Sequence, residues 1–132
     1  QRTIMAIRIR AKPRHDIKDS EYLLKRADIQ TALFGDTAYD SEKIHEFCWN
    51  KGIQTQIKPR KNVIRGFYRM KQMKNYSEKE YHQRSLVESG FGSLKRKYGG
   101  FTLAINWRAI RNEAYLRAIA HNLRLSSLEI FN

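Results

Sequence analysis

The sequence is poor in the residues that build disulfide scaffolds, fibres and membrane spans. Its 132 residues include one Cys, two Pro and seven Gly. A single cysteine, Cys48, excludes an internal disulfide and a cysteine-rich zinc site, and it predicts a protein of the reducing cytoplasm. So little Pro and Gly excludes collagen-like and most disordered chains. The longest run without a charge, residues 98–107, is too short for a membrane-spanning helix, so no membrane partner is expected.

Acidic residues are also scarce, and their scarcity is local. The net charge is +13, of which residues 47–132 carry +12 (17 Lys and Arg, 5 Asp and Glu). Residues 47–77 hold no acidic residue and eight basic ones, namely Lys51, Lys58, Arg60, Lys61, Arg65, Arg69, Lys71 and Lys74. Phe67, Tyr68 and Tyr76 stand among these, which allows both phosphate contact and base stacking. The pattern predicts a polyanionic partner, a nucleic acid or an acidic surface.

Hydrophobic periodicity predicts an α/β order in the first 57 residues. The expected elements are a strand at 3–11, a helix at 17–27, a strand at 31–34, a helix from Asp40 or Ser41 to Asn50, and a strand at 53–57. Within the second helix Ile44, Phe47 and Cys48 form an apolar stripe at helical spacing. Strands that alternate with helices favour a parallel sheet.

The second half reads as mostly helical. Residues 59–76 lack clear periodicity and are expected to form a basic connector. Ser77 and Glu80 have capping-box spacing, so a helix is predicted from Ser77 to Tyr98. Gly90 and Gly92 weaken that helix by roughly 1 kcal/mol each relative to Ala. A last helix is predicted over residues 107–125.

Two places could carry chemistry. Asp36 stands just past a predicted buried strand, where α/β sheets usually bind ligands, although an aspartate there can also simply bond its own turn. On the Ser77 helix, Tyr81, Arg84, Glu88 and Lys95 fall within one narrow stripe. Such a stripe could hold a metal ion and phosphates, or it could be a surface ion-pair ladder.

Taken together, these residues resemble a known family. The spacing Tyr81-x-x-Arg84-x-x-x-Glu88-x-x-x-x-x-x-Lys95 is similar to the Tyr-Arg-Glu-Lys motif of insertion-sequence DDE transposases. The segment Gly35-Asp-Thr-Ala-Tyr-Asp-Ser41 resembles the one that carries that family's second catalytic aspartate. Residues 57–62 and 14–20 resemble two further family segments, so the resemblance runs over about residues 6–123.

The resemblance implies a ribonuclease H-like fold in which three carboxylates bind two Mg²⁺ or Mn²⁺ ions. It makes Asp36 and Glu88 two of those catalytic, metal-binding carboxylates. It assigns contacts with DNA phosphates to Tyr81, Arg84, Lys95, Lys58, Arg60 and Lys61. The implied reaction is nicking at transposon ends and strand transfer to target DNA, in the prokaryotic cytoplasm at the nucleoid. Besides DNA, the implied partner is a second copy or the missing N-terminal part.

One departure from the family pattern concerns the first catalytic aspartate, which lies upstream of everything in this chain. Asp16, Asp19 and Asp28 are the upstream candidates, and Asp19 aligns with a helix start instead. We therefore expect residues 1–132 to form a single partial catalytic domain, truncated at the N-terminus with its first strands missing and inactive by itself. The alternative is a catalytically inactive DNA-binding remnant.

The charge pattern predicts how DNA binding responds to salt. Eight basic side chains uninterrupted by acids should release counterions from several phosphates, so the affinity should be sequence-tolerant and should fall at least about tenfold between about 50 and 200 mM salt. Fluorescence anisotropy with labelled duplexes of unrelated sequence measures this. An affinity that is unchanged over the same salt range would contradict the prediction.

Overall fold

The computed structural model describes residues 3–12, 15 and 17–130; for residues 86–88, 90, 91, 129 and 130 it describes the backbone alone. The chain divides into two compact units. One unit is residues 14–84, and the other combines residues 1–13 with residues 85–132. Each unit is built from its own elements.

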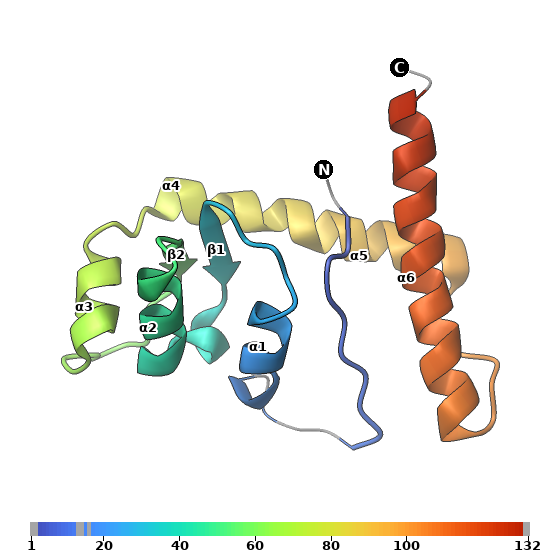
Figure 1. Cartoon of the computed structure of the whole chain (residues 1–132), viewed down its shortest axis with the longest axis horizontal. Coiled ribbons are helices and arrows are strands. Elements are labelled where there is room, and N and C mark those ends of the chain that lie inside the picture. The colour runs from blue at the N-terminus through green and yellow to red at the C-terminus, as the bar shows by residue number, and fades with distance from the viewer. Residues whose placement is uncertain (1–2, 13–14, 16, 131–132) are drawn as a thin grey trace. The chain divides into compact units, whose positions relative to one another are not determined.

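The unit of residues 14–84 contains a parallel strand pair. Strands β1 (Ala32–Gly35) and β2 (Gln54–Ile57) pair in register from Ala32 opposite Gln54 to Gly35 opposite Ile57. Helix α2 (Glu42–Asn50) connects them (Figure 1), which confirms the predicted parallel α/β order for this part. The other elements here are α1 (Ile17–Leu24), η1 (Thr37–Tyr39), α3 (Phe67–Met73), α4 (Glu78–Tyr81) and η2 (His82–Arg84).

The apolar core of this unit lies where α2 covers the strands. Its buried members are Leu24, Ile44, Cys48, Ile53 and Ile57, against which Phe47 and other partly buried side chains pack. The predicted apolar stripe of α2 is therefore confirmed. Cys48 is fully buried, and burial raises the pKa of its thiol to about 11, so at neutral pH the thiol is an unreactive core group.

The free edge of β2 is closed by amide side chains. Gln72 of α3 is buried; its Oε1 accepts from Thr55 N at 3.2 Å and its Nε2 donates to Ile53 O at 2.9 Å. The side chain thus makes the two hydrogen bonds that a neighbouring strand would make. Gln56 of β2 bonds the segment that follows α3: its Nε2 donates to Asn75 O at 2.8 Å. These bonds satisfy an edge that would otherwise attract another chain.

Ser77 begins a helix as predicted. Its side chain accepts from Glu80 N, which caps α4. The second capping-box bond, in which the Glu80 carboxylate would accept from Ser77 N, is absent. Both of these groups bond Gln56 instead. Gln56 Oε1 accepts from Ser77 N at 2.9 Å, and Gln56 Nε2 donates to Glu80 Oε2 at 2.8 Å. The capping pair therefore anchors α4 to β2.

The predicted continuous helix from Ser77 to Tyr98 is wrong. The 3-10 turn η2 interrupts it between α4 and α5 (Ser85–Tyr98). The single stripe predicted for Tyr81, Arg84, Glu88 and Lys95 stays a prediction, because these residues are divided between the two units. The side chain of Glu88 lies outside the described residues.

The basic connector predicted for residues 59–76 contains a helix, α3. The sequence offers no local cap for it, because the residue before Phe67 is Gly66. The cap comes from α2 instead. Glu42 accepts from Tyr68 N at 2.9 Å and from Arg69 N at 3.1 Å, which satisfies two N–H groups of the first turn. Gly66 has a φ of 112°, and a Cβ there would lie 2.3 Å from Glu42 Oε2, so only glycine fits.

The strand predicted at residues 3–11 is also wrong. Among the described residues of this segment none is in a strand. Ile4 instead bonds a side chain of α6 (Trp107–Ile130), donating from N to Asn122 Oδ1 at 2.8 Å and accepting at O from Asn122 Nδ2 at 2.7 Å. Alternating apolar and polar residues indicate a segment with one solvent-exposed face. Such a segment forms a strand only where the backbone of another strand is available for hydrogen bonding.

Two helices end at other residues than predicted. Helix α1 ends at Leu24, earlier than the predicted residue 27, and α6 continues to Ile130, past the predicted residue 125. Asn106 starts α6 by accepting from Ala109 N at 2.9 Å. In the part of the chain that the structure describes, no helix combines the length and apolar character needed to cross a membrane.

Candidate functional site

Asp36 lies at the carboxyl end of β1, directly before η1. Its Oδ1 accepts from Ala38 N at 2.9 Å, so the turn hydrogen bond considered for this residue is present. That bond occupies one oxygen. The other, Oδ2, lies 3.7 Å from Arg84 Nη2, and the Asp36 side chain is 41% exposed. Asp36 therefore keeps an accessible carboxylate oxygen beside a guanidinium group.

The basic residues after β2 lie at the same edge of the sheet. Lys58 N donates to Gly35 O at 3.3 Å, which continues the ladder and places Lys58 beside the start of the Asp36 turn. Arg60 Nε donates to Thr37 O at 3.3 Å, within that turn. Lys61 is exposed in the following turn. Sheets of this kind bind ligands at the carboxyl ends of their parallel strands. Here these ends place the Asp36 carboxylate beside several cationic side chains.

Two residues of the Tyr-Arg-Glu-Lys spacing also meet here. Arg84 Nη1 donates to Tyr81 Oη at 3.2 Å while its Nη2 faces Asp36. Lys58 Nζ lies 6.0 Å from the centre of the Tyr81 ring. The structure thus brings together Asp36, Lys58, Arg60, Tyr81 and Arg84, which the sequence places in three separate segments.

Two further predicted site residues lie in the other unit. Glu88 and Lys95 belong to α5 in the other unit, and Lys95 is exposed. The shared site of Asp36 and Glu88 stays a prediction. Of the upstream acids, Asp16 lies outside the described residues, Asp19 is in the first turn of α1, and Asp28 is exposed near Gln30. Among the side chains that the structure describes, which do not include that of Glu88, no group of three His, Cys, Asp or Glu residues is placed to hold a metal ion.

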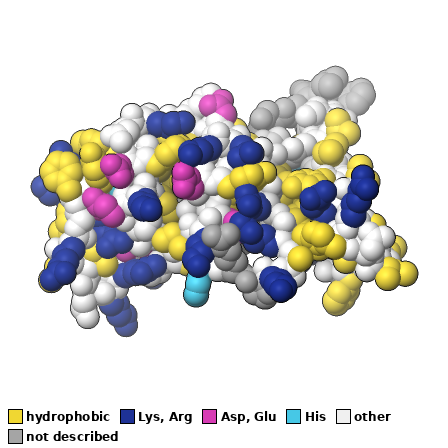
Figure 2. Space-filling model, turned by 60° about the horizontal axis from the view of Figure 1, so that its bottom comes forward, with side chains coloured by type: hydrophobic (Ala, Val, Ile, Leu, Met, Phe, Trp, Pro, Cys, Tyr) yellow, Lys and Arg dark blue, Asp and Glu magenta, His cyan; other side chains and the backbone are white. Residues whose placement is uncertain are grey.

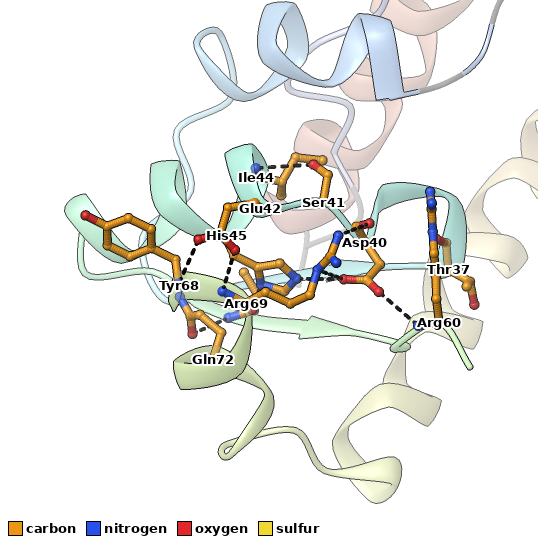
Figure 3. A network of polar contacts seen from close by, with 11 residues as sticks. Thr37, Asp40, Ser41, Glu42, Ile44, His45, Arg60, Tyr68, Arg69 and Gln72 are labelled. Atoms are coloured by element: carbon orange, nitrogen blue, oxygen red, sulfur yellow. Dashed lines mark hydrogen bonds and ion pairs between the residues drawn. The ribbon is translucent and has the colours of Figure 1, made fainter. Parts of the chain in front are cut away.

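Sequence reasoning missed the carboxylate of Asp40, which is the centre of a buried network (Figure 3). Its side chain is 1% exposed. Oδ1 lies 3.1 Å from His45 Nε2 and 3.0 Å from Arg69 Nε, an ion-pair distance without the angle of a hydrogen bond. Oδ2 accepts from Arg60 N at 2.9 Å, and Asp40 O accepts from Arg69 Nη2 at 2.9 Å. The network holds the backbone of the basic segment beside Asp36.

His45 extends this network to β2. Its Nδ1 lies 2.9 Å from Thr55 Oγ1. A carboxylate can only accept, so Nε2–H donates to Asp40. In the neutral imidazole Nδ1 then accepts from the Thr55 hydroxyl. Burial lowers the pKa of His45, and this effect outweighs the opposing hydrogen bond and charge of Asp40.

The sequence does contain a signal for this network. Asp40 and Ser41 are neighbouring cap candidates, and a helix uses one cap. Ser41 takes that role by accepting from Ile44 N at 3.4 Å, which frees Asp40 for other partners. His45 stands next to Ile44 on the buried face of α2, and a buried imidazole needs a polar partner. What the sequence could not supply is the identity of that partner.

Comparison with known proteins identifies the family. A family model described as a transposase DDE domain matches residues 1–123. This chain belongs to the transposase DDE domain family. No curated protein and no solved structure matches the chain.

Family membership gives the site its context. DDE transposases are nucleases that act on DNA in transposition, they use divalent metal ions, and their domain suggests a ribonuclease H-like fold. In this DDE domain the parallel strands, the aspartate after β1 and the cations around it agree with that context.

The neutral His45 of this DDE domain makes stability depend on pH. Its folded-state pKa lies below the ordinary 6.5, so the unfolded chain binds the proton more tightly. The stability that neutral His45 contributes is therefore complete well above pH 6.5 and is lost as pH falls through 6.5 towards the folded pKa. We expect the urea midpoint to fall between about pH 7 and 5, and His45→Gln to flatten this slope.

The control for this prediction is His82→Gln, which changes an exposed histidine of η2 and should keep the wild-type slope. His45→Gln should also lower stability at pH 7, because the Thr55 contact is lost. If wild type and His45→Gln lost stability in parallel as the pH falls, another group would be responsible.

Proposed function

We propose that this chain contributes to metal-dependent nicking at transposon ends and to strand transfer into target DNA, and that Asp36 and Glu88 are its metal-binding carboxylates. The observation that carries the proposal is the approach of Arg84 to Asp36, with Oδ2 and Nη2 3.7 Å apart. The family resemblance assigns Asp36 to the catalytic carboxylates and Tyr81 and Arg84 to contacts with DNA phosphates, so both segments should lie at one site. The contact joins those segments.

The donor atoms at Asp36 suit the ions that the family uses. Carboxylate oxygens are the ligands that Mg²⁺ and Mn²⁺ prefer, and Asp36 keeps one oxygen that is not taken by the turn hydrogen bond. Bound ions would supply an activated attacking oxygen and stabilise the leaving one. Asp36 by itself is a weak ligand set, so the proposal requires Glu88 as a second donor.

The cations around Asp36 have a role that needs no metal. Arg84 is aligned by its hydrogen bond to Tyr81 and can bind a DNA phosphate through its planar guanidinium group. Lys58, Arg60 and Lys61 follow β2 at the same edge and can neutralise neighbouring phosphates of the strand. We assign Lys95, on α5, to the same contacts by its motif position. These residues would position the scissile phosphate near the carboxylates.

A complete DDE centre has three carboxylates, and we propose that this chain supplies two. Asp19 lies in the first turn of α1, and Asp28 is exposed in the segment before β1. Neither belongs to a metal-binding group among the described residues. A further aspartate from another segment would then complete the site.

The alternative is a DNA-binding protein without catalysis. The contact of Asp36 with Arg84 is compatible with this alternative too, since an ion pair of this kind can persist without any metal. Both proposals require the basic residues to bind DNA. They differ in whether Asp36 and Glu88 bind a divalent ion.

Thermal unfolding with Mn²⁺ distinguishes the two. If Asp36 and Glu88 share a site, Mn²⁺ relieves their mutual repulsion and should raise Tm by roughly 3–8 °C at about ten times its Kd. Asp36→Asn should abolish the rise while keeping the turn bond to Ala38, and Glu88→Gln should abolish it as well.

Glu46→Gln is the matched control, because Glu46 is an exposed glutamate of α2 far along the chain from the motif. It should leave the rise intact. An equal rise in wild type, Asp36→Asn and Glu88→Gln would show that these carboxylates are not a metal site and would favour the alternative.

Plasmid cleavage tests whether two carboxylates suffice. We expect the purified 132-residue chain to leave supercoiled DNA intact in Mg²⁺ or Mn²⁺, because in-line displacement needs ligands that fix both ions. Divalent-dependent cleavage that disappears in both Asp36→Ala and Glu88→Ala would contradict this expectation. It would mean that one of Asp16, Asp19 or Asp28 completes the centre.

A further inference from the structure

An exposed aromatic pair lies on α2 and α3, outside the residues assigned to the strand-end site. Trp49 lies in the last turn of α2 and is 41% exposed, and Phe67 is the first residue of α3 and is 63% exposed. The ammonium group of Lys71 lies 4.8 Å from the centre of the Trp49 ring and 4.2 Å from that of Phe67. One cation thus joins two accessible rings from different helices, and these three residues form the aromatic–lysine face.

The face is held by buried interactions of the fold. Glu42, in the first turn of α2, caps α3 through Tyr68 N and Arg69 N. Arg69 also reaches the buried Asp40 carboxylate (Figure 3). Phe67 and Lys71 stand four residues apart, on one side of α3. The backbone beneath the rings is therefore fixed before any ligand arrives.

Packing in the core does not account for the two exposed rings beside Lys71. Neither ring completes the core, which Ile44, Cys48 and the strand residues fill. Residues 47–77, which supply both rings and Lys71, hold no acidic residue, and the nearby Glu42 has both oxygens bound to α3. Figure 2 shows, over one side of the molecule, many Lys and Arg side chains spread among hydrophobic ones. The chemistry favours a flat, anionic ligand.

We propose that the aromatic–lysine face binds DNA whose bases are unpaired, with bases stacked on Trp49 and Phe67 and a phosphate at Lys71. Bases within a duplex hide their faces in the stack, whereas a single strand offers both a π surface and a nearby phosphate. Phosphate contact by itself would need cations and no rings. The proposal rests on the proposed function, since it takes DNA as the substrate and names the form that this face binds.

Trp49 fluorescence tests the proposal. The chain has two tryptophans, so Trp107→Phe leaves Trp49 as its one indole. In that background we compare an oligothymidylate of about 12 nucleotides with an abasic strand of the same length and charge. Oligothymidylate should quench Trp49 and bind about tenfold more tightly than the abasic strand, because base stacking adds to the phosphate contacts.

Variants separate stacking from charge. Phe67→Leu should bring the affinity for oligothymidylate close to that for the abasic strand and leave the latter unchanged. Lys71→Met should weaken both. Phe101→Leu is the matched control, since Phe101 is 87% exposed in the other unit and the variant should bind like its parent. Phe67 is exposed, so its substitution should not prevent folding, which circular dichroism verifies.

Equal affinities for the two strands, or an equal loss for both in Phe67→Leu, would overturn the proposal. Quenching by polyglutamate but not by oligothymidylate would also overturn it and assign the face to an acidic protein. The Mn²⁺ effect on Tm is measured without oligonucleotide. If that effect is present and stacking is not, the proposed function stands and this inference fails.

Discussion

The unit of residues 14–84 depends on one buried carboxylate. Asp40 contacts the imidazole of His45, the guanidinium of Arg69 and the backbone N–H of Arg60, and it is almost fully removed from water. A buried charge is costly unless it is paired, and removing one partner of such a group typically costs about 3–5 kcal/mol. The elements that carry these partners are thus bound to a common point: α2, α3 and the segment after β2.

This constraint explains why the strand-end site is ordered although it lies in turns. The basic segment leaves β2 through Lys58 and is held again at Arg60 N, so its side chains stay beside the Asp36 turn. On the other side, Gln56 ties Ser77 and Glu80 to β2 and so fixes the start of α4, from which Tyr81 and Arg84 approach Asp36. Buried hydrogen bonds position exposed charges on both flanks.

Helix α3 links the site to the aromatic–lysine face. The same short helix supplies Gln72 to the edge of β2, Arg69 to Asp40, and Phe67 and Lys71 to the surface. Its inner side therefore completes the sheet while its outer side offers rings and a cation. In the two proposals above, the residues beside Asp36 take part in cutting, and the aromatic–lysine face holds unpaired DNA.

The sequence by itself determined the properties that depend on local patterns. A short apolar run, helical spacing and a capping pattern predicted the parallel strands with α2 between them, the stripe of Ile44 and Cys48, and the helix start at Ser77. Each of these signals reflects the geometry of a single element. The motif spacing led to the transposase DDE family, which the family match confirms. The position of Asp36 directly after a strand followed from the same reasoning, although in β1 only Gly35 is buried and the other three residues are partly buried.

Tertiary structure decided everything that requires a partner from elsewhere in the chain. Residues 3–11 alternate like a strand, but Ile4 bonds Asn122, and the segment makes no strand. Helix α3 forms where no local cap exists, because Glu42 provides one from α2. The helix after Ser77 breaks at η2, and Asp40 is a network centre instead of a cap. Hydrogen bonds between distant residues leave no periodic trace in a sequence, so only the folded chain reveals them.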